Sequence, residues 1–317
     1  MLETGSSLVE ETMQRLKEEK RVIPGINDAI FKRIMMNHKE YLARILKEFI
    51  PLDYEVILEE LIYIHNEFPA DNYTVKSSRT DLLVKVRNFY IQIEANKVLD
   101  DDLILRNDTH FDALCLRIDG EKEKKNFNER LLQLNVNGKI KTKDIPNLDK
   151  KGIVRLQYMD KQDEILDPRY TKIHLNIEKC VNKWYTKSEL EWLDKAQALL
   201  LVEDIHELNE LVKGDDILEK VGQSIMDYSS ISDIINDHLY ELIEENYKHN
   251  SLKRAEMEAT ERGMEKGMQQ GMQQGIEEGS RLEKIEIAKS MLEDNMSIEL
   301  VSKYSGLSIS ELEKLTN

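Results

Sequence analysis

Two acidic residues in the stretch TDLLVKVRNFYIQIEANK, residues 80–97, could share a metal ion. Asp81 precedes one β-rich apolar run, and Glu94 follows the next. If Arg87 and Asn88 form a two-residue turn, with Asn88 adopting the positive φ that such a turn requires, cross-strand partners have residue numbers that sum to 175. Asp81 then lies opposite Glu94 on the same face of the hairpin. Like charges in that position destabilise a strand pair, so we expect a divalent cation between them.

The chemistry that this pair would support is metal-ion catalysis. Mg²⁺, or Mn²⁺ in its place, binds one or two protein carboxylates and completes its shell with water and phosphate oxygens. Such an ion lowers the pKa of a bound water and stabilises charge on phosphorus. Gln92 and Asn96 share the face of Glu94, whereas Lys97 is expected on the other face unless a β-bulge brings it round. In the alternative interpretation, the two carboxylates are splayed at a sheet edge and separately hydrated.

Helices and strands alternate along the part of the chain that must position these residues. The spacing of apolar residues predicts helices over INDAIFKRIMMN, with Asn27 or Asp28 as the N-cap, over YLARILKEFI, and after the aspartates at 100–102. Strands are expected at the hairpin and within RLLQLNVNG, IVRLQYMD and TKIHLNIEKC. EVILEELIYIHNEF fits helix and strand equally. The pattern is typical of an α/β fold followed by an α-helical region.

Composition narrows the class of protein. The chain has 317 residues and a net charge of −16, which argues against a protein that coats nucleic acid nonspecifically. Residues 121–161 nevertheless carry eleven lysines and arginines against six acids, and this window is either a phosphate-contacting patch or a solvated basic loop region. We find no long apolar run, no leader, no disulfide framework and no zinc-type cluster, and therefore expect a cytoplasmic protein.

The C-terminal part of the chain differs from the rest in its sequence pattern. Glycines recur every fourth residue from Gly263 to Gly279. Because each glycine costs a helix about 1 kcal/mol relative to alanine, the segment is either a flexible tether or a helix that a second helix approaches closely, and we favour helical self-association. The last residues resemble a helix-turn-helix unit in which Ser308 and Glu311 form a capping box. Its final helix is acidic, which favours an interaction module over a reader of DNA bases.

The order of these motifs resembles a known family. An aspartate, a hairpin and then Glu-x-(Lys or Gln) is the active-site layout of the PD-(D/E)xK nuclease superfamily, and the wider context resembles its recombination-promoting nuclease and transposase family. The matching positions are Asn27, Asp28, Phe31 and Lys32 for the opening motif, Asp81, Glu94-Ala95-Asn96 in place of Glu-x-Gln, and Arg106 on the following helix. LLQLNVN and the C-terminal segment from the glycine repeat onward are also similar to that family.

The resemblance implies a restriction-endonuclease-like core, a mixed sheet flanked by helices, that cleaves DNA with Mg²⁺ in recombination or transposition. Through the glycine-repeat segment, we expect it to work as a homo-oligomer. Asp81 and Glu94 would hold the metal, the third residue would orient the attacking water, and Arg106 would clamp a phosphate or pair with an acid. Asn96 departs from the family, because it is shorter than glutamine and has no basic function. The alternative is a catalytically degenerate relative that binds DNA or a protein partner without cutting, and a further one is a purely structural assembly protein.

The same reasoning divides the chain into segments. We expect a flexible arm at 1–22, the nuclease-like core at 23–187, a helical region at 188–255, the glycine-repeat helix or tether at 256–280, and the helix-turn-helix-like tail at 281–317.

Overall fold

The structure is a computed structural model of the chain, and it describes residues 2–64, 82–120, 128–143, 145, 148, 152–159 and 165–316. The strands are β1 (Ile62–Ile64), β2 (Leu82–Val86), β3 (Phe89–Leu99), β4 (Arg130–Ile140), β5 (Ile153–Met159) and β6 (Ile165–Asn176). The helices that accompany them are α1 (Leu2–Glu18), α2 (Asp28–Asn37), α3 (Lys39–Lys47), α4 (Tyr54–Glu60), α5 (Asp101–Gly120), α7 (Ile177–Tyr185), α8 (Trp192–Ala198), α9 (Ile205–Val212) and α10 (Asp216–Tyr228). The C-terminal helices are α11 (Ser232–Glu293), α12 (Ile298–Ser305) and α13 (Ile309–Thr316).

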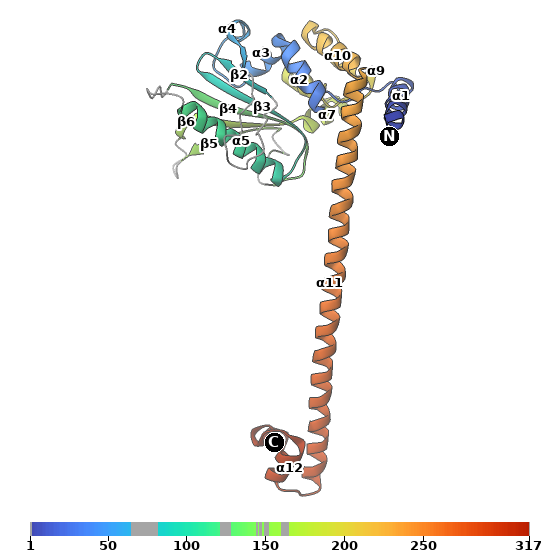
Figure 1. The fold of residues 1–317 in the computed structure, drawn as a ribbon. Helices are drawn as coiled ribbons and strands as arrows, with labels where there is room; N and C mark the ends of the chain where they lie inside the picture. The colour runs from blue at the N-terminus through green and yellow to red at the C-terminus, as the bar shows by residue number, and fades with distance from the viewer. Residues whose placement is uncertain are drawn as a thin grey trace. The chain divides into compact units, whose positions relative to one another are not determined.

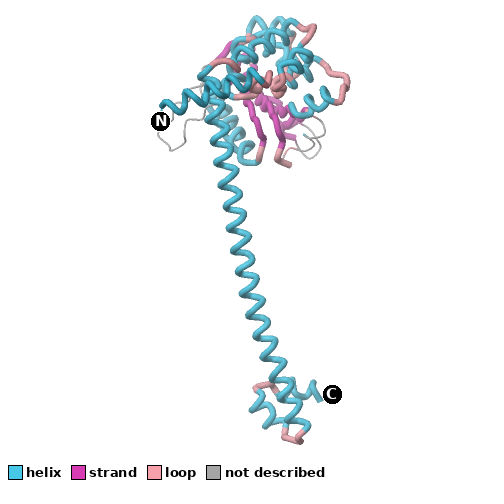
Figure 2. The backbone as a smooth tube through the Cα atoms, turned by 90° about the vertical axis from the view of Figure 1, so that its right-hand side faces the viewer, coloured by secondary structure: helices cyan, strands magenta, loops and turns pink. Residues whose placement is uncertain are grey.

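The six strands form one mixed sheet in the order β1-β2-β3-β4-β6-β5. The sheet and the helices beside it are seen in Figures 1 and 2. β1, β2 and β3 are antiparallel neighbours, whereas β4 runs parallel to β3 and β6 runs parallel to β4. α5 makes the crossover between β3 and β4 that parallel strands require. The predicted α/β class is therefore confirmed as a mixed sheet flanked by helices, followed by a helical region.

The central strands β3, β4 and β6 have one apolar face and one face that is largely polar. Ile91, Ile93, Leu134 and Ile173 point into the main hydrophobic core, which α2, α3 and α7 to α10 complete. On the opposite face, α5 packs Phe111, Leu114 and Ile118 against Leu83 and Leu131 at one end of the strands. Further along β3, β4 and β6, the buried side chains on the α5 face are polar.

The helices outside the sheet share the main core. α1, from the segment predicted as a flexible arm, packs Val9, Met13 and Leu16 against it. α8 to α10, from the segment predicted as a separate helical region, bury Ala198, Leu208 and Leu218 in the same core. The chain forms two compact units, Met1–Glu241 and Leu242–Asn317.

Local capping explains where several elements begin. Asn27 caps α2, its side chain accepting a hydrogen bond from the Ile30 amide at 3.4 Å, as the sequence predicted. The ambiguous stretch after Asp53 contains both a helix, α4, and a strand, β1. The strand predicted over 171–180 ends at Asn176, because this side chain accepts a hydrogen bond from the Lys179 amide at 3.3 Å and starts α7. The strand prediction is therefore wrong for residues 177–180.

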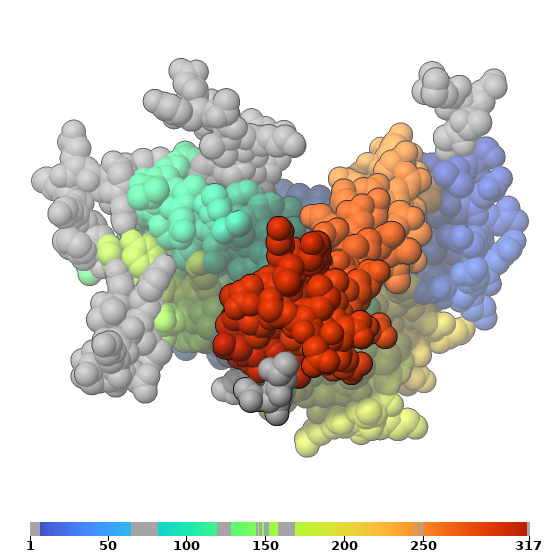
Figure 3. Space-filling view, turned by 90° about the horizontal axis from the view of Figure 1, so that it is seen from below, coloured from blue at the N-terminus to red at the C-terminus, as the bar shows by residue number. Residues whose placement is uncertain are grey.

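The second unit contains the glycine repeat and the tail. α11 is continuous through all five glycines, so this segment is helical in the structure rather than a tether. The tail buries Ala288, Val301, Leu307 and Leu312 in a small core of its own and forms a closely packed cluster (Figure 3). The predicted capping box is present, since the Ser308 amide donates to Glu311 Oε2 at 3.0 Å and the Glu311 amide donates to Ser308 Oγ at 3.3 Å. No helix within the described ranges combines the length and the apolar character that spanning a membrane requires.

Candidate functional site

Polar side chains form three rows across β3, β4 and β6 on the face that α5 covers. Side chains two apart on a strand share a face, and the parallel register brings them level. The rows are Gln92–Gln133–Lys172, Glu94–Asn135–His174 and Asn96–Asn137–Asn176. Asn107 from α5 lies against them. We call these residues apart from Lys172 the polar lattice, and each of its members is at most 4% exposed. A buried group of this size must satisfy its own hydrogen bonds.

Backbone carbonyls fix the orientation of the central amides. Asn137 Nδ2 donates to the carbonyls of Asn135, at 3.1 Å, and Leu175, at 2.9 Å. Its oxygen can therefore only accept, and Asn96 Nδ2 donates to it at 2.8 Å. Gln133 Nε2 donates to the Asn107 carbonyl at 2.7 Å, and Asn135 Nδ2 donates to Gln133 Oε1 at 3.2 Å. Each amide has one orientation that fits this chain of hydrogen bonds.

Asn107 ties the helix to the sheet. Its Nδ2 donates to Asn96 Oδ1 at 3.1 Å and to Asn135 Oδ1 at 3.2 Å. Phe111, Leu114 and Ile118 follow it at helical spacing on the buried side of α5. Asn107 is thus the polar member of an otherwise apolar helix face.

Glu94 contributes a buried carboxylate to the lattice. It is 1% exposed, and its Oε1 accepts a hydrogen bond from Gln92 Nε2 at 2.6 Å. Because a carboxylate can only accept, this bond also fixes the orientation of the Gln92 amide. Burying an ionised carboxylate is costly unless hydrogen bonds or a cation compensate it.

Three buried polar atoms of the lattice have no hydrogen-bond partner among the described residues. They are Gln92 Oε1, Asn107 Oδ1 and His174 Nδ1. The two amide oxygens are acceptors by the orientations derived above, so each lacks a donor or a cation. A buried polar group without a partner costs about 1–3 kcal/mol. Together with the Glu94 carboxylate, these oxygens are the donor type that hard cations such as Mg²⁺ prefer.

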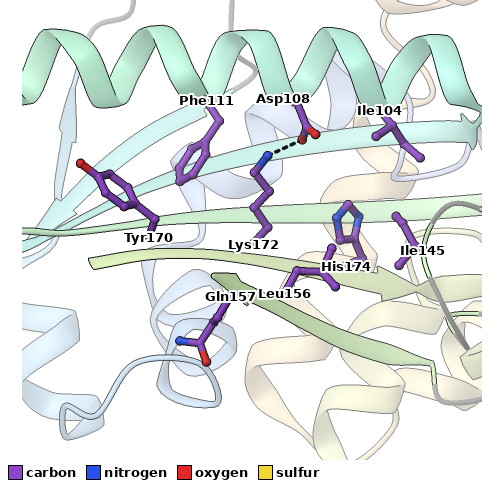
Figure 4. Close-up of a pocket in the computed structure, with 9 residues that line it drawn as sticks. All are labelled: Ile104, Asp108, Phe111, Ile145, Leu156, Gln157, Tyr170, Lys172 and His174. Atoms are coloured by element: carbon purple, nitrogen blue, oxygen red, sulfur yellow. Dashed lines mark ion pairs between the residues drawn. The ribbon is translucent and has the colours of Figure 1, made fainter. Parts of the chain in front are cut away.

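A pocket of about 350 Å³ opens beside the lattice, between α5 and strands β5 and β6 (Figure 4). Lys172 and His174 enter it from β6, and Lys172 Nζ pairs with Asp108 Oδ1 of α5 at 2.7 Å. Its other walls are mainly apolar and come from Ile104, Phe111, Ile145, Leu156 and Tyr170. The pocket therefore combines an apolar lining with a few convergent polar groups, as ligand sites do.

His174 is neutral in this setting. Burial lowers its pKa to about 4, an effect that the Lys172 charge reinforces and the Asp108 charge opposes. Among the described residues, no group of three or more His, Cys, Asp or Glu side chains could hold a metal ion.

The hairpin register is as predicted wherever the structure describes it. Partners run from Leu82 with Ile93 to Val86 with Phe89, and their numbers sum to 175. Asp81 itself lies outside the described residues. The positive φ of the turn falls on Arg87, at 52°, and not on Asn88 as predicted. Hydrogen bonds of both turn residues stabilise this conformation of the turn. The Arg87 guanidinium donates to Glu60, and Asn88 Nδ2 donates to the Asn128 carbonyl.

The other predicted site residues separate into two groups. Gln92, Glu94 and Asn96 lie together in the lattice. Lys97 points to the opposite face, where its Nζ pairs with Glu241, and the constant register of β3 with β4 shows no bulge that would bring it round. Arg106 is exposed on α5, while its neighbour Asn107 is the residue that faces the site.

Sequence reasoning missed the lattice residues of α5, β4 and β6. The signal was present in the alternation of Gln133, Asn135 and Asn137 in QLNVN, which places an amide at every second position of a strand.

Comparison with family models, with curated proteins and with solved structures finds no match for this chain. Fold and site thus define a mixed α/β protein with a buried polar lattice on the face of its sheet that a crossover helix covers.

Proposed function

We propose that the protein is a Mg²⁺-dependent DNA endonuclease of the PD-(D/E)xK type, linked to recombination or transposition. The observation that supports this most is the position of Glu94. It is a buried carboxylate on a hairpin strand whose described register, extended by one pair, assigns residue 81 to it. The pairing of Asp81 with Glu94 stays a prediction. The mixed sheet flanked by helices is the type of core that the sequence resemblance implies.

The side chains around Glu94 offer oxygen atoms, which are the ligands that a hard cation prefers. Glu94 and the unpartnered Gln92 Oε1 are oxygen donors on one strand, and they are next to each other because Gln92 Nε2 donates to Glu94. In the proposal, Glu94 and Asp81 hold Mg²⁺, or Mn²⁺ in its place. A bound ion of this type supplies a water of lowered pKa and stabilises charge on a scissile phosphate.

Asn96 takes a different role from the one the sequence suggested. Both polar atoms of its side chain are engaged, Nδ2 with Asn137 and Oδ1 with Asn107. In the proposal it is therefore a positioning residue that fixes the end of β3 beyond Glu94, and it does not bind the attacking water. Arg106 remains available on the surface of α5 for a phosphate contact.

A second candidate function is DNA or protein binding without cleavage. Two observations favour it: Asn96 is locked into the lattice, and Lys97 faces away from Glu94. A core of this type in which an amide held in the lattice takes the place of the third motif residue would keep its fold and lose the chemistry.

We also propose that the protein acts as a homo-oligomer through α11. Five glycines lower the stability of an isolated helix by about 5 kcal/mol. Every residue of α11 from 251 to 284 is exposed, including Met264, Met268 and Met272. A helix with this composition gains stability from close packing against a second helix, which a glycine stripe allows.

Cleavage of supercoiled plasmid tests the enzymatic proposal. We expect nicking with Mg²⁺ or Mn²⁺, none with EDTA, and loss of nicking in Asp81→Asn and Glu94→Gln. Glu210→Gln, an exposed carboxylate on α9, is the matched control and should cleave normally. Equal nicking by all variants would reject the site, whereas salt-sensitive DNA binding without any nicking would favour the second candidate function.

A further inference from the structure

A second pocket, of about 480 Å³, brings together three arginines from adjacent strands. Arg130 begins β4, Arg155 lies on β5 and Arg169 lies on β6. Alternation places them on the face opposite α5, since Arg130 is two positions before the core residue Leu132 and Arg155 pairs with Ile173. This arginine pocket is thus separate from the polar lattice.

Two of the arginines are neighbours across the sheet. Leu131 pairs with Tyr170, so Arg130 and Arg169, which precede them on parallel strands, lie side by side and both line the pocket. Like charges in neighbouring cross-strand positions repel, and an anion between them relieves the repulsion. This concentration of cations occurs in a chain with a net charge of −16.

Two of the arginines make contacts with the walls of the pocket, and Thr171 adds a neutral donor. Arg155 donates one hydrogen bond to the Phe49 carbonyl at 3.3 Å, and the Arg130 guanidinium carbon lies 5.6 Å from the centre of the Phe89 ring. A guanidinium has five N–H donors, so these contacts leave donors of both groups for a ligand. Thr171 Oγ1 accepts from Gln157 Nε2 at 3.1 Å, which leaves the hydroxyl proton for a further acceptor.

We infer that the arginine pocket binds a phosphate group of the DNA backbone. Planar guanidinium groups recognise phosphate through paired N–H donors, and several of them around one cavity suit its tetrahedral oxygens. Arg130 and Arg155 both come from the basic window 121–161, so the structure brings two of its cations together with a third from outside it. The choice of DNA as the source of the phosphate rests on the proposed function.

The test measures binding of a labelled DNA duplex to the full chain in EDTA over a range of salt concentrations. The triple variant Arg130→Gln, Arg155→Gln, Arg169→Gln should bind at least about tenfold more weakly, because charge-assisted hydrogen bonds are lost. The slope of log affinity against log salt should fall by about 1 for each phosphate contact removed. Arg33→Gln, Lys187→Gln, Lys213→Gln, which removes three exposed cations elsewhere, is the matched control and should keep most of the affinity.

Inorganic phosphate provides a second readout. It should raise the melting temperature of the wild type and the control, but not that of the triple variant. If the triple variant fails to fold, Arg130→Gln alone should lower the salt slope by about 1. Unchanged duplex binding in the folded variants would overturn the assignment, and so would a phosphate effect that is lost while duplex affinity stays the same.

The outcome separates this proposal from the nuclease proposal. Binding is measured without a divalent metal, so a chain that never cleaves can still lose duplex affinity in the pocket variants, and the pocket assignment then stands alone. A chain that cleaves through Glu94 and binds normally without the three arginines rejects the pocket alone.

Discussion

Asn107 Nδ2 donates to Asn96 Oδ1 at 3.1 Å, which joins α5 to β3 within the polar lattice. The same nitrogen also reaches Asn135 Oδ1, at 3.2 Å, so one helical side chain connects two neighbouring strands. α5 is also the crossover between β3 and β4, the two strands that it connects through this amide. The position of the helix over Glu94 therefore depends on Asn107 as well as on the apolar contacts further along α5.

Asn107→Ala should lower the free energy of unfolding by about 2–4 kcal/mol. The change leaves two buried amide oxygens without their donor and opens a small cavity. Urea denaturation measures the loss, and Asp112→Ala, at an exposed position of the same helix, should change stability by less than about 0.5 kcal/mol. If both variants were equally stable, the lattice would not be what fastens α5 to the sheet.

His174 should make the protein less stable in mild acid. Its native pKa is lowered to about 4 by burial, with a further contribution from Lys172, while the unfolded chain takes up a proton near the ordinary value of 6.5. Between these two values the unfolded state binds more protons, so stability falls as the pH is lowered and this contribution levels off below about pH 4. The effect between about pH 7 and pH 5 is about 2 kcal/mol.

The variant His174→Gln isolates this contribution. His238 has a pKa lowered to about 4 in the same way, by burial and the charges of Lys97 and Arg15, so part of the acid sensitivity remains in the variant. Urea denaturation at both pH values should show a smaller difference for His174→Gln than for the wild type. An unchanged difference would mean that the pKa of His174 is about the same in the native and unfolded states.

Sequence reasoning succeeded where the strand period alone decides the outcome. The period of two placed Gln92, Glu94 and Asn96 on one face and Lys97 on the other, and the hairpin register follows from the two-residue turn. The buried side of α5 was not predicted, although Phe111 and Leu114 at four and seven positions after Asn107 indicate it. Asn137, the acceptor for Asn96 Nδ2, comes from a parallel pairing over 41 residues, which no local pattern in the sequence specifies.

Lys97→Gln should leave metal-dependent nicking intact while lowering stability by about 1 kcal/mol. Lys97 is on the face opposite Glu94, and its Nζ pairs with Glu241, which also accepts a hydrogen bond from Asn27 Nδ2 at 2.8 Å. Because the ion pair is only partly buried, its loss lowers the stability of the protein only modestly. Glu241→Gln should have a similar effect on thermal unfolding. Loss of nicking in a Lys97→Gln protein that melts like the wild type would instead assign Lys97 to the chemistry.

Gly267→Ala with Gly271→Ala should weaken self-association, although it raises the helix propensity of α11. Alanine favours a helix over glycine by about 1 kcal/mol per position, and within one chain an added Cβ at either glycine meets nothing within 4 Å. A single α11 is thus stabilised by the change, whereas a second helix packed on the glycine stripe meets two new methyl groups. Sedimentation equilibrium should show a shift toward monomer.

The matched control replaces Gln269 and Gln273 with alanine. These positions follow the two glycines by two residues, which places them about 200° round the helix from the stripe. Both double variants gain helix propensity, but only the glycine variant should dissociate, because only its new methyl groups lie where the partner helix packs. If both associate like the wild type, the glycines serve no close helix contact and α11 does not assemble the protein through them.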